Sequence, residues 1–231
     1  MRTLDLSTCP RQEHFDFFRQ MTEPFFGVTV TVDCTQAYQF AKERQLPFFL
    51  YYLHCSLKAA NQLEPFRYRI QSEQVIIHDR IDASPTINRP NGTFGFSYIE
   101  YTEALEQFIT GAESEIARVR QSTGLELAGG RDHIIHYSTL PWLSFTALSH
   151  ARHFAFPDSV PKITFGKITE SAGKKTYQSP SMSTMDSSTG TMLVSTSIYF
   201  RNYCSKNKFR ANNSSKDLIF AAAKNARVVK W

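Results

Sequence analysis

The sequence lacks several features that mark common classes of protein. None of its apolar runs is long enough to span a bilayer, and the first residues hold no apolar signal-peptide core. Its four cysteines, at positions 9, 34, 55 and 204, are scattered, and no two have the spacing of a metal or redox motif. These absences predict a cytoplasmic protein with reduced thiols and without a membrane partner.

The composition is also free of strong bias. Apolar residues make up 42% of the 231 residues and charged residues 20%, which are ordinary values for a globular protein. There is no internal repeat and no Pro- or Gly-rich linker. The chain is therefore neither disordered, collagen-like nor a heptad-repeat protein, and its length favours one domain.

The net charge of +5 is unevenly distributed. Residues 201–231 hold eight Lys or Arg and one acidic residue, whereas residues 1–200 hold slightly more acidic than basic residues. Nucleic-acid binding would depend on this tail alone, and we expect no nucleic-acid partner.

Periodicity predicts helices and strands that mix along the chain. Apolar residues at helical spacing predict helices over 13–21, 35–44, 48–60 and about 103–119. Alternation or short apolar runs predict strands over 25–32, 66–70, 74–78, 93–101, 132–139, 142–148 and 162–169, with turns over 82–92. This order indicates an α/β fold, an α+β two-layer sandwich with one large mixed β-sheet covered by helices.

The C-terminal quarter differs from the rest. Residues 177–231 are rich in Ser, Thr, Asn and Lys and follow neither periodicity, apart from a short helix-like stretch over 218–226. We therefore divide the chain into residues 1–176, which form the domain, and 177–231, an atypical tail.

Five short motifs stand out in residues 8–176. They are Arg11–Phe15 (RQEHF), Pro65–Arg67 (PFR), Thr93–Phe94 (TF), Ser138–Phe145 (STLPWLSF) and Ile163–Lys167 (ITFGK). In their order and spacing, these motifs resemble the chloramphenicol acetyltransferase family. The resemblance implies the CoA-dependent acyltransferase fold and a homotrimer with active sites at the subunit interfaces. It also implies transfer of the acetyl group of acetyl-CoA to the hydroxyl of a small molecule, of which chloramphenicol is the family's best-known example.

The resemblance also implies roles for single residues. In this family a histidine removes the proton of the acceptor hydroxyl, and a serine hydroxyl and a threonine-held water stabilise the oxyanion. Ser138 matches the serine and Thr164 the threonine, while Arg11 matches the arginine of a structural ion pair. Phe17 and Phe18 fall where aromatic residues line the acceptor pocket, although some members have Tyr at the second position. The family implies no metal site.

The family's catalytic motif, His-His-x-x-x-Asp-Gly, is missing. It should follow Thr176 closely, yet no histidine occurs after His153. The general base and the aspartate that would pair with Arg11 are both absent from the chain as written.

The genetic code offers an explanation for this absence. If one nucleotide was lost just before the codon of Gln178, the original codons begin at the third base of each present codon. Residues 178–195 then permit Pro-Val-Ser-Ile-His-Val-His-His-Gly-Leu-Ile-Asp-Gly-Tyr-His-Val-Gly-Gln, in which the catalytic histidine overlaps Thr184 and Met185. Asn207 and Lys208 permit a stop codon in the same frame.

An out-of-frame tail would remove a central strand and the closing helix. We therefore expect the chain as written to be catalytically inactive and poorly folded. The alternative is a non-catalytic relative that binds CoA or a protein partner. The dihydrolipoamide acyltransferase cores share the missing motif, but the chain is short and has no lipoyl domain.

Other histidines are weaker candidates. His150 and His153 could replace the missing base, and His133, His136 and His150 could in principle hold a metal ion. No spacing supports the metal site, and His150 and His153 are only weak candidates for the base, in the SHARHF segment after the predicted strand over 142–148.

Overall fold

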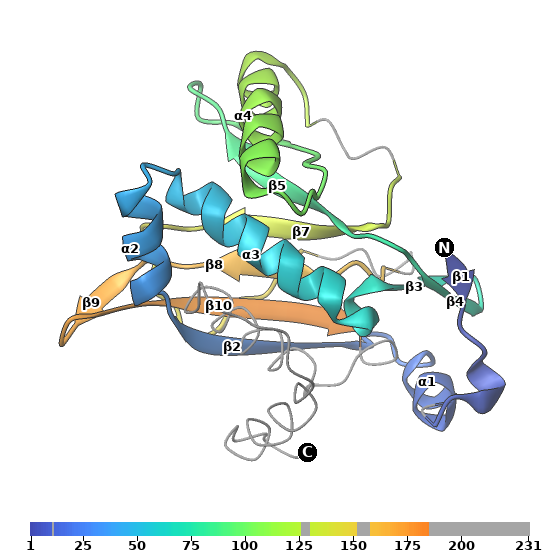
Figure 1. Ribbon diagram of the computed structural model, residues 1–231. Coiled ribbons are helices and arrows are strands. Elements are labelled where there is room, and N and C mark those ends of the chain that lie inside the picture. The colour runs from blue at the N-terminus through green and yellow to red at the C-terminus, as the bar shows by residue number, and fades with distance from the viewer. Residues whose placement is uncertain (11, 126–129, 152–157, 185–231) are drawn as a thin grey trace.

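The computed structural model describes residues 1–10, 12–125, 130–151 and 158–184, with residues 180–184 described by their backbone alone (Figure 1). No helix in these ranges is long and apolar enough to cross a membrane. Within the same ranges, Cys9, Cys34 and Cys55 are free thiols.

A large mixed sheet forms one layer of the molecule. Its strands lie in the order β2-β10-β8-β7-β5-β6, and β9 pairs with β10 beside this path. β5, β7 and β8 are parallel to one another, whereas β10 is antiparallel to both β2 and β8. The bounds are Phe25–Asp33 for β2, Asp82–Asn88 for β5, Phe94–Phe96 for β6, Ile134–Thr139 for β7, Lys162–Phe165 for β8, Thr169–Ser171 for β9 and Lys174–Thr184 for β10.

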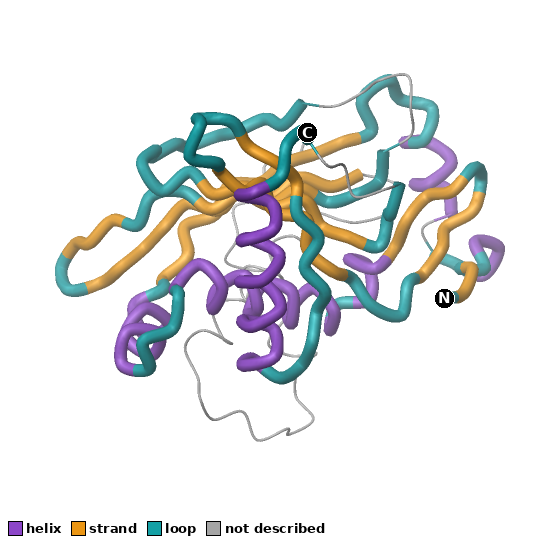
Figure 2. Tube along the Cα trace, turned by 90° about the horizontal axis from the view of Figure 1, so that it is seen from above, coloured by secondary structure: helices purple, strands orange, loops and turns teal. Residues whose placement is uncertain are grey.

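Three helices form the second layer, on one face of the sheet (Figure 2). They are α2 (Thr35–Glu43), α3 (Phe48–Gln62) and α4 (Leu105–Gln121), and α3 contacts both of the others. Ten of the fifteen residues of α3 are buried, because this helix lies across the sheet between its neighbours. The two-layer sandwich predicted from the sequence is confirmed.

The core lies between α3 and the centre of the sheet. The Tyr52 ring of α3 packs 4.5 Å from the Phe165 ring of β8, which in turn stacks on Tyr137 of β7 at 5.8 Å. Tyr177 of β10 joins the same cluster. The helix layer therefore covers alternate residues of β7, β8 and β10, and the residues between them face the other side of the sheet.

A small sheet and a short helix lie beside the sandwich. β1 (Arg2–Thr3), β4 (Gln74–Ile77) and β3 (Tyr68–Gln71) form a three-stranded antiparallel sheet. α1 (Gln12–Phe18) lies near it, at the end of the molecule where β2 begins (Figure 1). The short helices η1 (Leu6–Thr8) and η2 (Glu64–Arg67) connect these parts.

Three expectations from the sequence are wrong. Residues 82–92 are not mainly turn, because Asp82–Asn88 forms β5, a largely buried strand parallel to β7. The strand predicted over 93–101 shortens to β6, followed by a single bridge from Ile99 to Ala83. Residues 142–148 form no strand, and their backbone turns beside the end of β8 instead.

Strand β10 occupies the central position of the sheet that was expected to lack a strand. This strand runs through the proposed boundary at residue 176 and continues to Thr184 between β2 and β8. Its backbone pairs with β2 over nine consecutive positions, from Thr176 opposite Asp33 to Thr184 opposite Phe25. The backbone groups of the neighbouring strands are therefore not left unpaired, contrary to that expectation.

Candidate active site

Ser138 and Thr164 lie side by side on neighbouring parallel strands. Ser138 is near the end of β7 and is in register with Thr164 of β8. Tyr137 and Phe165, their chain neighbours, pack under α3, so both hydroxyl side chains face the side of the sheet away from the helices. Thr164 is fully buried and Ser138 partly buried. The two residues matched to oxyanion stabilisation are thus brought together.

His150 contacts Thr164 of this pair from the loop that follows β7. Its Nε2 lies 2.8 Å from the Thr164 Oγ1, within hydrogen-bond distance. The sequence offers His150 as a weak replacement for the missing base and as one of three possible metal ligands, and no local pattern predicts this contact. His153 lies outside the described residues.

His136 lies two residues before Ser138 on the same face of β7. Burial, followed by the nearby Lys162 ammonium, lowers the pKa of His136 to about 4. The ring is therefore neutral at neutral pH and a poor general base there.

The motifs Ser138–Phe145 and Ile163–Lys167 contact each other at the C-terminal end of β8. A Cβ atom at Gly166 would lie 3.0 Å from the Phe145 ring and 3.1 Å from the backbone oxygen of Gln178, so only glycine fits without a shift. The Lys167 N–H donates to the Leu143 carbonyl at 3.0 Å, and the Leu140 N–H to the Phe165 carbonyl at 2.8 Å. These bonds anchor the loop after Ser138 to β8.

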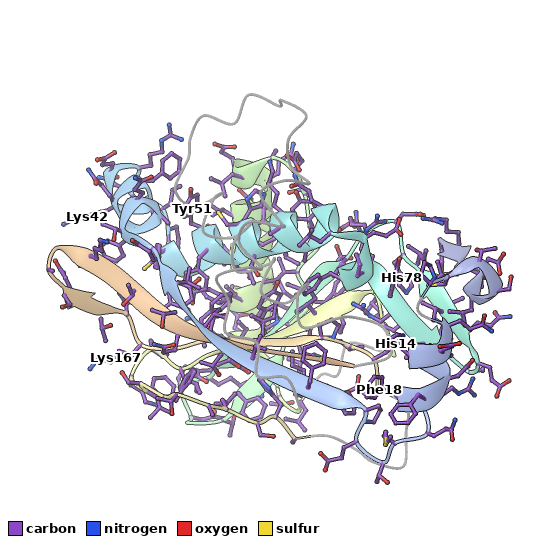
Figure 3. The ribbon with its side chains drawn as sticks, turned by 90° about the horizontal axis from the view of Figure 1, so that it is seen from below. His14, Phe18, Lys42, Tyr51, His78 and Lys167 are labelled. Carbon is purple, nitrogen blue, oxygen red and sulfur yellow. The ribbon has the colours of Figure 1, made fainter. Side chains whose placement is uncertain are left out.

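The anchored loop exposes apolar side chains. Trp142 is 63% exposed and Leu143 is 44% exposed, although both are large and apolar. Figure 3 shows Lys167, whose N–H bonds to Leu143, at the opposite end of the sheet from α1.

Phe17 and Phe18 lie on α1, away from Ser138 and Thr164. Their rings meet edge to face at 5.2 Å, and Phe17 is 58% exposed. Figure 3 shows Phe18 beside His14, below the small sheet. Helix α1 ends at Phe18, shortly before β2 begins at Phe25. Phe25 pairs with Thr184, the last residue of β10. The predicted acceptor residues therefore lie near the end of β10.

Arg11, matched to the structural ion pair, lies outside the described residues, as does everything after Thr184. The structure thus gathers Ser138, Thr164 and His150 into one group and places Phe17 and Phe18 in another.

Comparison with known proteins places this arrangement in a family. The model of the family described as "Chloramphenicol acetyltransferase" matches residues 1–174, three quarters of the chain. The chain belongs to the chloramphenicol acetyltransferase family. The match ends three residues before the atypical tail, and it includes Ser138 and Thr164.

Individual relatives agree with this assignment. The chain is 26% identical to chloramphenicol acetyltransferase 2 of Haemophilus influenzae over 144 residues, which are 62% of this chain and 68% of that protein. It is 24% identical to chloramphenicol acetyltransferase 3 of Escherichia coli over 147 residues, 63% of this chain and 69% of that one. A solved chloramphenicol acetyltransferase superposes with a TM-score of 0.82 at 26% identity, covering 88% of this chain and 99% of that chain.

A more distant neighbour shares the fold alone. The solved dihydrolipoamide acetyltransferase of Azotobacter vinelandii superposes with a TM-score of 0.61 at 13% identity, covering 84% of this chain and 86% of that chain. The two chains therefore share the overall fold.

Proposed function

We propose that the gene derives from an acetyl-CoA-dependent O-acetyltransferase of chloramphenicol acetyltransferase type, acting on the hydroxyl of a small molecule. We further propose that the chain as written is inactive, because its residues from about 177 are read out of frame. The family membership supports the first part, and the composition of β10 supports the second.

The observation that carries the second part is the register of β10. On the helix side of the sheet, Val30 of β2 is in register with Ser179, which is only 5% exposed. Two residues on, Ser181 stands between Val28 of β2 and Ile163 of β8. Apolar strands thus flank a run of alternate serines, which is an unfavourable composition for a central strand.

The alternative frame corrects this composition. It permits valine at 179, isoleucine at 181 and valine at 183, the positions that share the face of Tyr177. Polar residues then fall at 180 and 182, on the face shared with Thr164. The frame that restores the catalytic motif therefore also restores the alternation that a strand in this position requires.

The strand register also supports the expected homotrimer. The Gly166 N–H donates to the Gln178 carbonyl, and Ser181 is opposite Ile163, so Thr164 lies opposite position 180. The restored histidine would follow Thr184, about 15 Å further along the strand. A side chain cannot span that separation, so Ser138 and Thr164 would meet a histidine of a second copy. Exposed Trp142 and Leu143 fit such an interface.

The chemistry follows from these roles. The histidine would remove the proton of the acceptor hydroxyl, whose oxygen attacks the thioester carbonyl of the substrate acetyl-CoA. The Ser138 hydroxyl would donate to the developing oxyanion, and Thr164 would hold a water that does the same. Collapse of the intermediate releases the CoA thiolate, which takes the proton from the imidazolium. Without the histidine, the chain as written retains the oxyanion groups but no base.

An acetyl-transfer assay tests this proposal. The chain as written and a chain with one nucleotide inserted before codon 178 are compared, with release of thiol from acetyl-CoA as the readout and chloramphenicol as the acceptor. We expect turnover from the restored chain alone, which sediments as a trimer. Turnover by the chain as written would contradict the proposal, as would a folded restored chain without activity. CoA binding by the chain as written, with no activity in either chain, would favour the non-catalytic alternative.

A further inference from the structure

A group of metal-ligating side chains lies away from Ser138 and Thr164, where the small sheet meets the large one. His78 directly follows β4, and Asp132 and His133 directly precede β7. One potential ligand atom from each of these three residues lies within 4.8 Å of the other two. Figure 3 shows His78 beside the small sheet.

The backbone fixes both segments. The His78 N–H donates to the Arg67 carbonyl at 3.0 Å, and the Asp82 N–H donates to the His133 carbonyl at 2.9 Å. The side chains therefore project from strand ends that are tied into the two sheets, rather than from free loops.

His78 directs a buried nitrogen at Asp132. Its Nε2 lies 3.1 Å from Asp132 Oδ1 and contacts no other hydrogen-bonding group among the described residues. The other carboxylate oxygen, Asp132 Oδ2, accepts a hydrogen bond from the Gln71 amide at 2.7 Å. Asp132 is thus oriented, with one oxygen directed at His78.

The His133 ring is also oriented by neighbours. Tyr98 Oη lies 3.3 Å from His133 Nε2, and the same hydroxyl donates to Asp82 Oδ2 at 2.6 Å. Asp82 Oδ2 itself lies 3.8 Å from His133 Nε2. Carboxylates and hydroxyls placed in this way commonly orient metal-binding histidines.

We infer that His78, Asp132 and His133 bind a divalent transition-metal ion of the Zn²⁺ class. Two imidazoles and one carboxylate suit Zn²⁺ and related ions rather than Mg²⁺ or Ca²⁺, which prefer oxygen ligands. Tetrahedral bonds of about 2.0–2.1 Å require ligand atoms roughly 3.4 Å apart, so small side-chain rotations complete the site. Three protein ligands leave a fourth position for water, which the partial exposure of Asp132 and His133 admits.

The neighbouring charges limit the affinity. Asp132 and Asp82 are negative, while the guanidinium groups of Arg69 and Arg80 are positive. Arg69 donates to the carbonyls of Phe66 and Ile134, so it is held close to the site. We expect weaker binding than at a four-ligand structural zinc site. The bound ion would link the end of β4 in the small sheet to the two residues that precede β7 in the large one.

Cobalt titration of the untagged 231-residue chain tests this inference. Added CoCl₂ should produce visible d–d absorption that saturates at one ion per chain and disappears when ZnCl₂ is added. His78→Ala and His133→Ala should each weaken binding by more than the ~10–100-fold typical of losing an outer-shell partner. Tyr98→Phe should weaken it within that smaller range.

Matched controls separate binding from folding. His14→Ala removes an exposed histidine on α1 and should bind like the parent chain. Circular dichroism of each variant shows whether the fold is kept, and ZnCl₂ should raise the melting temperature of the parent but not of His78→Ala. Absence of saturable absorption in the parent would overturn the inference and leave His78 and Asp132 as an ion pair. Equal binding by His78→Ala would overturn it as well.

Discussion

Replacing Ser179 by valine tests whether β10 occupies a position built for an apolar strand. Ser179 is 5% exposed and is in register with Val30 on the helix side of the sheet. Burying a valine side chain contributes about 1.5–3 kcal/mol relative to leaving it in water. Valine replaces the serine hydroxyl by one methyl group and adds a second, and fitting the extra methyl group into a packed core offsets part of this gain. Ser179→Val should therefore raise the free energy of unfolding by about 1–2 kcal/mol.

Urea denaturation followed by circular dichroism measures this change. Gln178→Val is the matched control, because it adds the same β-branched residue to the same strand but on the opposite face. Gln178 bonds there to the Thr31 hydroxyl at 3.0 Å, so its loss should not stabilise the chain. Destabilisation by Ser179→Val, or equal stabilisation by both variants, would refute the reasoning from register.

Three further results are expected. Folding lowers the pKa of His136 to about 4, so between about pH 6.5 and 4 the unfolded chain binds a proton that the native chain does not. The free energy of unfolding is therefore retained above pH 6.5 and falls by about 2–3 kcal/mol toward pH 4. Denaturation across this range should show a shallower slope for His136→Gln than for His14→Gln, and an unchanged slope would contradict the assignment. Arg69 is fully buried and donates to several backbone carbonyls. Arg69→Met should therefore lower the free energy of unfolding by at least about 3 kcal/mol, whereas Arg120→Met, at an exposed position, should change it little. Similar urea midpoints for the two variants would show that Arg69 does not stabilise the fold through these bonds. In the restored chain, Ser138→Ala should lower kcat about 10²–10³-fold, whereas Ser144→Ala should keep kcat near the parent value. Equal kcat values for the two variants would show that Ser138 does not stabilise the oxyanion.

Strong local patterns were sufficient to predict most elements. The alternation of Val28, Val30 and Val32 predicts β2, and the apolar face of 105–119 predicts α4, whose Phe108, Ile109 and Val119 are buried. In these elements local preference and tertiary packing agree.

Elements that depend on distant partners were not predictable. β5 contains Ser84, Pro85 and Thr86, which are typical of turns, but parallel pairing with β7 makes it a buried strand. The Pro85 carbonyl still accepts hydrogen bonds from Ser97. Conversely, the apolar residues Trp142 and Leu143 have a composition typical of a strand but lie in an exposed loop. The Leu140 N–H donates to Phe165 of β8 and the Lys167 N–H donates to Leu143, and these two bonds hold the loop against β8.

In the candidate site, too, some residues could be predicted from local sequence and others could not. Motif resemblance identified Ser138 and Thr164, and the parallel register of β7 and β8 explains why they meet. The contact between His150 and Thr164, and the group of His78, Asp132 and His133, join residues from separate segments. No spacing within one segment encodes such contacts, because they depend on how the strands assemble.

The nucleotide sequence of the gene across codons 174–208 decides whether residues from about 177 are read out of frame. The third bases of these codons decide whether the alternative frame encodes the family motif. We predict that, read from the third base of codon 177, the gene encodes His-His-x-x-x-Asp-Gly and reaches a stop codon that overlaps codons 207 and 208. Third bases that encode other residues at the two histidines or the aspartate would contradict it, and the tail would then be a native part of a non-catalytic relative.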